Sequence, residues 1–295
     1  MEIRQLTHFI AVAEERSFTR AARRVHIVQS GISTSVGALE RELGVALFQR
    51  SRRHVELTPA GRVLLGEARR VVAAMNAART AIGAAENGLT GALHVGLVAT
   101  IPPELRLAKL LRVMTRDHPA VSVRVTEVNS PTHEQVKNGE FDIAIGPGQA
   151  PAGLTTIPLA SYPLVLACPD HHRFAHRTSL ALGALREEPF IDLPIGWTVR
   201  SIVDRAFADA AIERRVALEV NQIRMLLQAV EAGIGVALVP GLCSRMSSNA
   251  RFVQIRPSIG SWELAISYLG PEPANPAARA FLTMLLTDFR SRAAT

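Results

Sequence analysis

The sequence predicts an α/β fold in three consecutive parts, and three observations along the chain support that prediction. Residues 1–58 contain short segments with apolar residues at helical spacing, followed by a basic turn. Residues 59–88 continue a single helical pattern without interruption. From residue 89 onward, short apolar runs alternate with amphipathic segments, which is typical of the strands and helices of a parallel α/β sheet.

The size and charge of the chain favour two domains and an anionic partner. A length of 295 residues exceeds the usual size of one domain, and a hydrophobic content of 48% is enough for ordinary cores. The net charge is +7; residues 1–87 hold 13 arginines and eight glutamates, so +5 of that charge lies at the front. A concentrated basic excess favours nucleic acid as the partner. The first residues lack the apolar core of a signal peptide, and no apolar run reaches the roughly 18 residues that cross a bilayer. We therefore expect a cytoplasmic protein without a membrane partner.

The front of the chain predicts three helices, over residues 3–15, 17–26 and the stretch "HIVQSGISTSVGALERELG". Ser17 is a suitable N-cap for the second helix. A turn of about four residues joins the second and third helices, which matches a helix-turn-helix. Four residues of the third helix form one buried stripe, and Gly44 is placed to end the helix. The stripe consists of Ile32, Val36, Leu39 and Leu43.

The outer face of the third helix is small and polar instead of charged. Its residues are Gln29, Ser30, Ser33, Thr34 and Gly37. Such side chains allow close approach to a partner and can hydrogen-bond to base edges or phosphates, although a small solvated helix face has the same appearance. The following segment carries three arginines within four residues and then the strand-like "HVELT", which favours a β-wing that contacts phosphates. These arginines are Arg50, Arg52 and Arg53.

The segment "LTHFIAVAEERSFTRAARRVHIVQSGISTSVGALERELGVALFQRSRRHVELTPAG" resembles the N-terminal part of the LysR-type transcriptional regulators. The resemblance lies in "SFTRAA", "LERELGVALFQR" and "LTPAG", and it continues more weakly through the rest of the chain. It implies a winged helix-turn-helix over residues 1–58, whose third helix enters the major groove of double-stranded DNA. Many relatives carry a basic residue where this chain has Thr34, Ser35 and Gly37, so base preference cannot be copied from them. The predicted DNA-binding residues are Thr19, Arg20, Gln29, Ser30, Ser33, Thr34, Arg50, Arg52 and Arg53.

Residues 59–88 predict one helix of about 43 Å at 1.5 Å per residue. Pro59 stands near its first turn and Gly88 follows its end. Six apolar residues form a heptad seam, which favours pairing with a second copy of the chain over packing on its own domain. The resemblance implies that this is the dimerisation linker helix of a homodimer, with a homotetramer built from two dimers. The predicted seam is Leu64, Ala68, Val71, Met75, Ala78 and Ile82.

Residues 89–295 predict alternating strands and helices in two lobes. We expect strands over 92–99, 121–129, 141–147, 162–169, 215–220, 234–240 and 263–270, and helices over 102–119, 130–140, 196–212, 221–233 and 277–291. Lobe I is predicted to span about 89–161 and 265–295, and lobe II about 162–264. The resemblance implies a two-lobed effector domain like the periplasmic binding proteins, with a cleft between its lobes.

Polar residues and helix starts follow several of the predicted strands. In open α/β sheets a ligand crevice lies beyond the carboxyl ends of the strands, and helix N-termini there bind anions. We therefore expect a small anionic or polar effector, although Ser, Thr and Asn at helix starts are most often caps. The predicted effector-binding residues are Thr100, Ile101, Asn129, Ser130, Ile145, Gly146, Gly196, Trp197, Thr198 and Asn221.

The sequence contains no motif that favours an enzyme, a cofactor or a metal site. Nucleophile-elbow, P-loop, dinucleotide-binding and zinc-protease patterns are all missing. The run "DHHRFAH" has no framework of further metal ligands, and Cys168 and Cys243 belong to no metal-binding or redox motif. We expect a DNA-binding regulator whose DNA affinity changes with a small ligand, with contacts to the transcription machinery as a further possibility. The alternative is a solute-binding or transport-receptor-like protein that does not regulate transcription.

Overall fold

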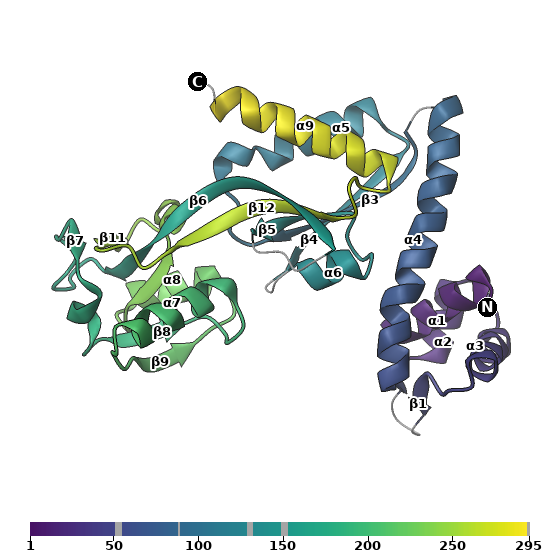
Figure 1. Ribbon diagram of the computed structural model, residues 1–295, viewed down its shortest axis with the longest axis horizontal. Helices are drawn as coiled ribbons and strands as arrows, with labels where there is room; N and C mark the ends of the chain where they lie inside the picture. Colours follow the sequence, from purple (N-terminus) through teal and green to yellow (C-terminus); the bar gives the residue numbers. More distant parts are fainter. Residues whose placement is uncertain (51–54, 88, 129–131, 149–152, 294–295) are drawn as a thin grey trace.

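Three helices and a two-stranded hairpin form the N-terminal part of the chain, at the right in Figure 1. The structure is a computed structural model that describes residues 1–50, 55–87, 89–128, 132–148 and 153–293. The front elements are α1 (Ile3–Glu15), α2 (Phe18–Arg24), α3 (Gln29–Leu43), β1 (Phe48–Arg50) and β2 (Val55–Leu57). The helices agree with the predicted ones to within two residues at most of their ends. Ser17 caps α2 as expected, since its Oγ accepts a hydrogen bond from the backbone N–H of Arg20 at 3.3 Å.

The apolar stripe of α3 packs against α1 and α2. Ile32, Val36 and Leu39 are completely buried, in one cluster with Phe9. Leu43, which the helical spacing assigns to the same stripe, is 40% exposed. It differs because α3 ends there and the chain turns away through Gly44, whose φ is 69°. This left-handed conformation favours glycine, so Gly44 ends the helix as the sequence predicts.

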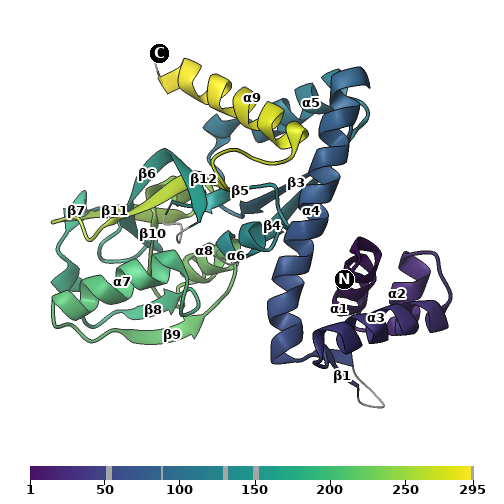
Figure 2. The same cartoon turned by 45° about the vertical axis from the view of Figure 1, so that its right-hand side comes forward.

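The long helix α4 (Pro59–Asn87) stands between the front helices and the α/β part of the chain (Figure 2). Its first turn passes very close to the hairpin. A Cβ added at Gly61 would lie 2.1 Å from the carbonyl oxygen of Leu47, so only glycine fits there. This contact fixes where α4 leaves the helix-turn-helix.

Lobe I is built on a parallel pairing of β3 with β4 and with β5. Helices α5 and α9 lie together on one side of this sheet, while α6 lies on the other (Figure 1). Its elements are β3 (Gly91–Val98), the short 3-10 helix η1 (Pro103–Leu105), α5 (Leu107–Asp117), β4 (Val121–Val128), α6 (His133–Lys137), β5 (Ile143–Pro147) and the last helix α9 (Pro276–Ala293).

Lobe II follows in the chain and contains shorter strands. β8 and β9 pair in parallel, while β10 and β11 pair antiparallel with β6. The elements are β7 (Ser179–Leu180), η2 (Leu182–Leu185), β8 (Pro189–Asp192), α7 (Thr198–Asp209), β9 (Arg215–Glu219), α8 (Ile223–Glu231), β10 (Ala237–Pro240), η3 (Gly241–Arg245) and β11 (Ala250–Ile255).

Two long antiparallel strands run from one lobe into the other. β6 (Leu154–Pro169) pairs with β12 (Ser261–Leu269), and β12 also pairs antiparallel with β5. The sheet is therefore mixed, whereas alternation of strands and helices predicts a parallel one. The predicted limits between the lobes, at 161/162 and 264/265, fall inside these two strands. The lobes are thus joined by paired β structure.

Other differences from the expected elements have local causes. The helix expected over 102–119 is interrupted at Arg106, whose φ of 42° separates η1 from α5. Strand β6 begins eight residues before the expected 162, and Pro158 lies within it beside the shift in its register with β12. Strands β7, β8 and β11 have no counterpart among the expected elements.

Among the described residues, no helix combines the length and apolar character that crossing a membrane requires.

Candidate functional site

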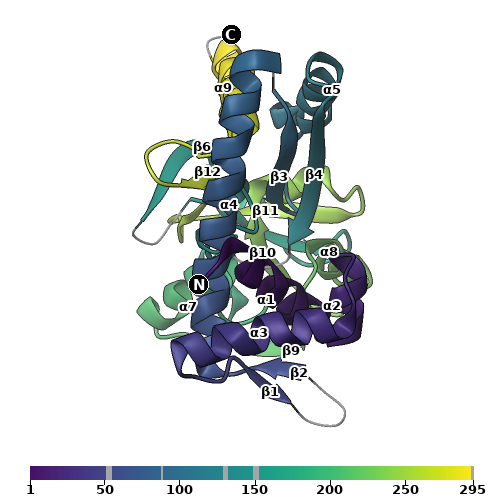
Figure 3. The same cartoon turned by 90° about the vertical axis from the view of Figure 1, so that its right-hand side faces the viewer.

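One end of the molecule presents α3 and the β1–β2 hairpin together (Figure 3). We call Gln29, Ser30, Ser33 and Thr34 the α3 face. Gln29, Ser30 and Thr34 are exposed, and Ser33 is half-buried. Thr19 on α2 donates a hydrogen bond from its Oγ1 to Oε1 of Gln29 at 3.2 Å. This bond orients the first side chain of the α3 face.

Arg20, one of the predicted DNA-binding residues, forms an ion pair with Glu15. Its Nε lies 3.5 Å from Oε2 of Glu15, and its Nη2 donates to the backbone carbonyl of that glutamate. The side chain is nevertheless 61% exposed. An exposed ion pair of this kind contributes little to stability and can exchange for another anion.

Ser35 does not belong to the outer face of α3. Its Oγ lies 2.8 Å from Nδ1 of His8, which is buried on α1. Burial, followed by the nearby charge of Arg4, lowers the pKa of His8, which favours the neutral imidazole. This polar contact between α1 and α3 went unrecognised in the sequence, because no local spacing links residues this far apart.

The hairpin β1–β2, called the wing below, is anchored to the end of α3. Oε1 of Glu40 accepts hydrogen bonds from the backbone N–H groups of Leu47 at 2.8 Å and Phe48 at 3.3 Å. Phe48 pairs with Leu57, and Arg50 with Val55, across the two strands. Arg50 is therefore the last residue of β1. Arg52 and Arg53 lie outside the described residues.

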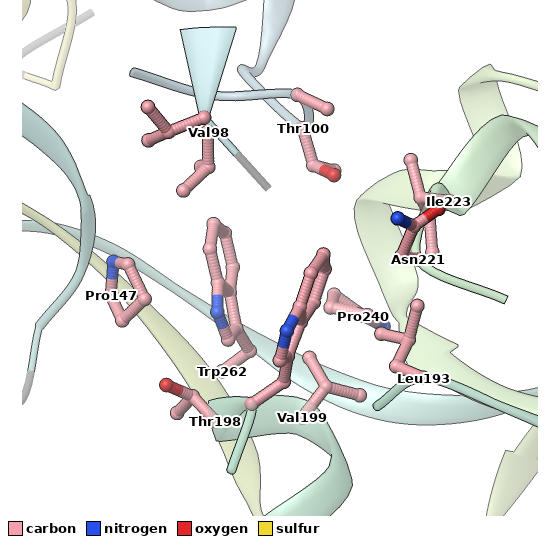
Figure 4. A pocket seen from close by; sticks show the side chains of 13 residues that line it. Val98, Thr100, Pro147, Leu193, Thr198, Val199, Asn221, Ile223, Pro240 and Trp262 are labelled. Carbon is pink, nitrogen blue, oxygen red and sulfur yellow. The ribbon is translucent and has the colours of Figure 1, made fainter. Parts of the chain in front are cut away.

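A cavity of about 70 Å³ lies between the two lobes. We call it the inter-lobe cavity, and Figure 4 shows side chains that line it. From lobe I, the ends of β3, β4 and β5 contribute to it; from lobe II, the residues after β8, the starts of α7 and α8 and the end of β10. The lining residues are Val98, Ala99, Thr100, Val128, Pro147, Leu193, Trp197, Thr198, Val199, Asn221, Ile223, Pro240 and Trp262.

Four of the ten predicted effector-binding residues come together in this lining: Thr100, Trp197, Thr198 and Asn221. Neither helix start uses a side chain as a cap: α7 begins after Trp197 and α8 after Gln222, without a side-chain hydrogen bond. Asn221 therefore does not cap α8, although Asn at a helix start is most often a cap, and it lines the cavity instead. The side chain of Thr198 lies in the first turn of α7, beside backbone N–H groups without intrahelical partners.

Four other predicted residues are described and do not line the cavity. Ile101 packs against the main core, Ile145 is completely buried in β5, and Gly196 is exposed with a φ of 90°. Gly146 lies behind the cavity wall, since an added Cβ would be 3.3 Å from Cγ1 of Val98. The remaining two, Asn129 and Ser130, lie outside the described residues.

The main lining residue that sequence reasoning missed is Trp262. It lies within β12, and only the pairing of β12 with β6 brings it to the cavity. Val98 and Pro147, the last residues of β3 and β5, were also missed, because the prediction chose Thr100 and Ile101 after the first strand and Ile145 and Gly146 in the third. The apolar residues at the ends of the strands were therefore the sequence feature from which this part of the lining could have been predicted.

The face of α4 that was predicted as a dimer seam is divided. Ala68 is 1% exposed and packs with Leu64 into the core of the helix-turn-helix. These two residues are therefore occupied within the chain, because the first half of α4 covers α1. Farther along, Val71 and Ile82 are exposed, at 41% and 69%. Met75 is half-buried and Ala78 is exposed.

Arg69 of α4 links the helix-turn-helix to lobe I. Its Nη2 lies 2.8 Å from Oε1 of Glu14 on α1, and its Nη1 pairs with Glu140, which follows α6. The guanidinium is largely buried, so this three-residue bridge is better shielded from solvent than an ordinary surface pair. The bridge lies at a groove of about 760 Å³ between α4 and lobe I.

Comparison with known proteins matches two parts of the chain to family models. The family model for a bacterial regulatory helix-turn-helix protein of the lysR family matches residues 3–62, and the model for the LysR substrate binding domain matches residues 86–290. The chain belongs to the LysR family. It is thus a DNA-binding transcriptional regulator with an effector-binding domain, and this family is one of regulators instead of enzymes.

Relatives of this LysR-type regulator cover most of its length. ClcR of Pseudomonas putida is 34% identical over 253 residues, covering 84% of this chain and 85% of that protein. AlsR of Bacillus subtilis is 31% identical over 250 residues, covering 83% and 82%. Among solved structures, a full-length OxyR variant from Pseudomonas aeruginosa has a TM-score of 0.74, 25% identity and coverage of 98% and 95%. Full-length CbnR in complex with its target DNA has a TM-score of 0.64, 26% identity and coverage of 99% of both chains.

The two cysteines of the regulator are buried thiols. Burial raises the pKa of Cys168 to about 11 and that of Cys243 to about 12. Both therefore stay protonated at neutral pH, which makes them poor nucleophiles. Within the described residues, no group of three or more His, Cys, Asp or Glu side chains is arranged to hold a metal ion.

Proposed function

We propose that the α3 face reads base edges in the major groove while the wing arginines Arg50, Arg52 and Arg53 contact phosphates. The observation that carries this proposal is the exposure of Gln29, Ser30 and Thr34 at the end of the molecule where the wing also lies. Hydroxyl and amide groups can recognise bases, and arginines supply affinity by releasing counterions. The solved complex of the similar CbnR with its target DNA supports this use of the fold.

The regulator is proposed to bind DNA as a homodimer, with a homotetramer as a pair of dimers. The exposed apolar part of α4, with Val71, Ala78 and Ile82, is the surface for the second copy. Two copies present two α3 faces to a site with approximate twofold symmetry. In this arrangement residues 1–58, 59–88 and 89–295 serve as DNA-binding domain, linker helix and effector domain.

The inter-lobe cavity is proposed as the effector site. Thr100 from lobe I and Thr198 and Asn221 from lobe II can each hydrogen-bond to a polar ligand that bridges the lobes. Such a ligand changes DNA affinity only if it favours one arrangement of the chain over another. The bridge from Glu140 through Arg69 to Glu14 is a direct path from lobe I to the helix-turn-helix. A change in DNA affinity or bending would then alter contacts with the transcription machinery.

A footprinting experiment tests the DNA-binding surface. The full-length protein, added to the DNA upstream of its own gene and of the neighbouring genes, is expected to protect a site with two half-sites. Replacing Arg50, Arg52 and Arg53 together by alanine should weaken protection at least about tenfold, since several phosphate contacts are lost. The matched control replaces the exposed lobe II arginines Arg215 and Arg251 by alanine and should leave protection unchanged. Equal loss in both variants would refute the assignment to the wing.

A further inference from the structure

The described side chains of the inter-lobe cavity offer hydrogen bonds but no charged group. Among its described lining residues only Thr100, Thr198 and Asn221 carry polar side-chain groups for a ligand besides the two indoles, and none of the lining side chains is ionisable. The other lining residues are apolar. A carboxylate that leaves water for such surroundings loses its hydration and meets neutral donors, such as the first backbone N–H groups of α7, but no cationic side chain in the described lining.

The arginine that follows the cavity wall on α7 is already paired. The Nε of Arg200 donates to Asp204 at 2.8 Å, and its Nη1 donates to the carbonyl oxygen of Leu193 at 2.9 Å. It also pairs with Asp192 at 3.4 Å. Asp192 is in turn shared with Arg214 at 2.7 Å. Moving Arg200 toward a ligand would leave the buried carboxylate of Asp192 with fewer partners, which is costly.

Aromatic surface dominates one part of the cavity wall. Trp197 and Trp262 are the two tryptophans of the chain, and both line the cavity. Trp262 is 4% exposed and is held by Tyr162 on the neighbouring strand, with ring centroids 6.4 Å apart and planes at 33°. Figure 4 shows the indole of Trp262 below Val98 and beside Pro147. A fixed indole face favours a flat ring, because aromatic rings gain energy from offset or edge-to-face contact beyond the area they bury.

We propose that the effector is an uncharged, planar aromatic molecule with one hydrogen-bonding group. Its ring contacts Trp197 and Trp262, and its polar group bonds to Thr100 and Asn221. This inference rests on the proposed role of the cavity as effector site, and it selects the polar alternative over the anionic one.

The small size of the cavity links the entry of an aromatic ring to a change in the arrangement of the lobes. Its volume of about 70 Å³ is smaller than the roughly 150 Å³ of an engineered protein cavity that binds benzene. A ring therefore enters only when the two lobes move apart or Trp197 shifts. Ligand binding and inter-lobe arrangement are then linked, as regulation by an effector requires.

Tryptophan fluorescence of the full-length protein tests the proposal without DNA, because both tryptophans line the cavity. The probes are benzamide, benzoate, which has the same ring with a negative charge, and cyclohexanecarboxamide, which has the same amide on a saturated ring. Benzamide should change the emission saturably, with half-saturation at a concentration at least about tenfold lower than either other probe. Benzoate or cyclohexanecarboxamide binding as tightly as benzamide would overturn the proposal, as would the lack of a saturable response to benzamide. Saturable binding of benzoate or cyclohexanecarboxamide in place of benzamide would keep the cavity as an effector site and overturn only the uncharged aromatic chemistry, so the two failures are distinguishable.

Two variants test whether the indole of Trp262 causes the preference for an aromatic ring over a saturated one. Trp262→Phe keeps a flat ring and should retain the preference for benzamide over cyclohexanecarboxamide. Trp262→Leu keeps an apolar side chain without the ring and should reduce that preference to less than about threefold. Thermal unfolding of both variants checks that the effector domain stays folded, and isothermal titration measures binding independently of the remaining indole. An unchanged preference in a folded Trp262→Leu protein would overturn the role of the aromatic wall.

Discussion

The α3 face and the inter-lobe cavity use opposite kinds of side chains for their ligands. The α3 face is exposed and polar, and it stands beside a wing whose sequence contains three arginines. The cavity is mostly apolar, its described lining residues have no charge, and its arginine neighbour is bound to acidic groups. The difference follows from the ligands, since DNA keeps its charge at a wet surface and a small effector must leave water.

The comparison also shows what each region needs from the rest of the fold. The α3 face depends on a local helical core, with Ile32, Val36 and Leu39 beneath it. The cavity depends on strands from both lobes and on the register of β6 with β12. One region can therefore be damaged while the other continues to bind.

The largest expected effect comes from a charge placed under the α3 face. Val36→Asp puts an unpaired carboxylate into a completely buried position and should cost more than about 4 kcal/mol, enough to unfold the helix-turn-helix. Circular dichroism and DNA binding should report this loss. Benzamide binding followed by tryptophan fluorescence should persist, because the cavity belongs to the other domain. Ser30→Asp, at an exposed position, is the folding control and should unfold at nearly the wild-type temperature.

A smaller effect is expected when polar groups of the α3 face are removed. Ser33→Ala combined with Thr34→Ala should reduce discrimination between the specific site and unrelated DNA by about 1–3 kcal/mol, the range of one good base contact. Competition binding with both DNAs measures this difference. Thr115→Ala, at an exposed position of α5, serves as the matched hydroxyl deletion. Equal weakening on both DNAs would assign these hydroxyls to phosphates instead of bases.

Loss of the Arg69 bridge should change the coupling between effector binding and DNA binding more than it changes either binding step alone. Arg69→Ala removes the bridge between Glu14 and Glu140 and should reduce the effector-dependent change in DNA affinity by about 0.5–2 kcal/mol. DNA titrations with and without benzamide measure that change. Arg70→Ala is the control, since Arg70 pairs with Glu67 on the same helix. Identical coupling in wild type and Arg69→Ala would exclude this path.

The smallest expected effect is a pH dependence of the helix-turn-helix. Burial, and then Arg4, lowers the pKa of His8 below its ordinary 6.5, so the folded state binds the proton more weakly than the unfolded state. The contribution of His8 to the free energy of unfolding should therefore be complete above about pH 6.5 and be lost as the pH falls below that value. Denaturant unfolding of wild type and His8→Gln across this range measures it. His133 in lobe I also has a burial-lowered pKa, so the comparison must follow DNA-domain signals. A wild type and a variant with the same pH slope would contradict the contribution of His8.

The front of the molecule was largely predictable from sequence because its signals are local. Helical spacing, the Ser17 cap and Gly44 determine α1 to α3 over few residues. Helical spacing does not say which surface an apolar stripe covers, so Ala68 was expected to face a second chain and instead packs on α1 and its neighbours. Ser35 was likewise not distinguishable as a partner of His8.

The α/β part was less predictable because its decisive contacts are between distant segments. The succession of strands and helices along the chain and a crevice beyond the strand ends follow from general rules, and Thr100 and Asn221 both line the inter-lobe cavity. The mixed sheet and the position of Trp262 depend on the pairing of β12 with β5 and β6. Strand pairing over such separations leaves no local trace in composition or spacing.

The salt dependence of DNA binding by the full-length protein tests the central claim most directly. Fluorescence anisotropy with the footprinted fragment should show affinity that falls linearly in a double-logarithmic plot as salt rises. With roughly 6–10 phosphate contacts from a dimer, the loss should be about 10³–10⁵-fold between 50 and 200 mM salt. The variant without Arg50, Arg52 and Arg53 should have a shallower slope. Affinity that does not change with salt, or a slope that is the same without these arginines, would contradict a DNA interface built from the α3 face and the wing.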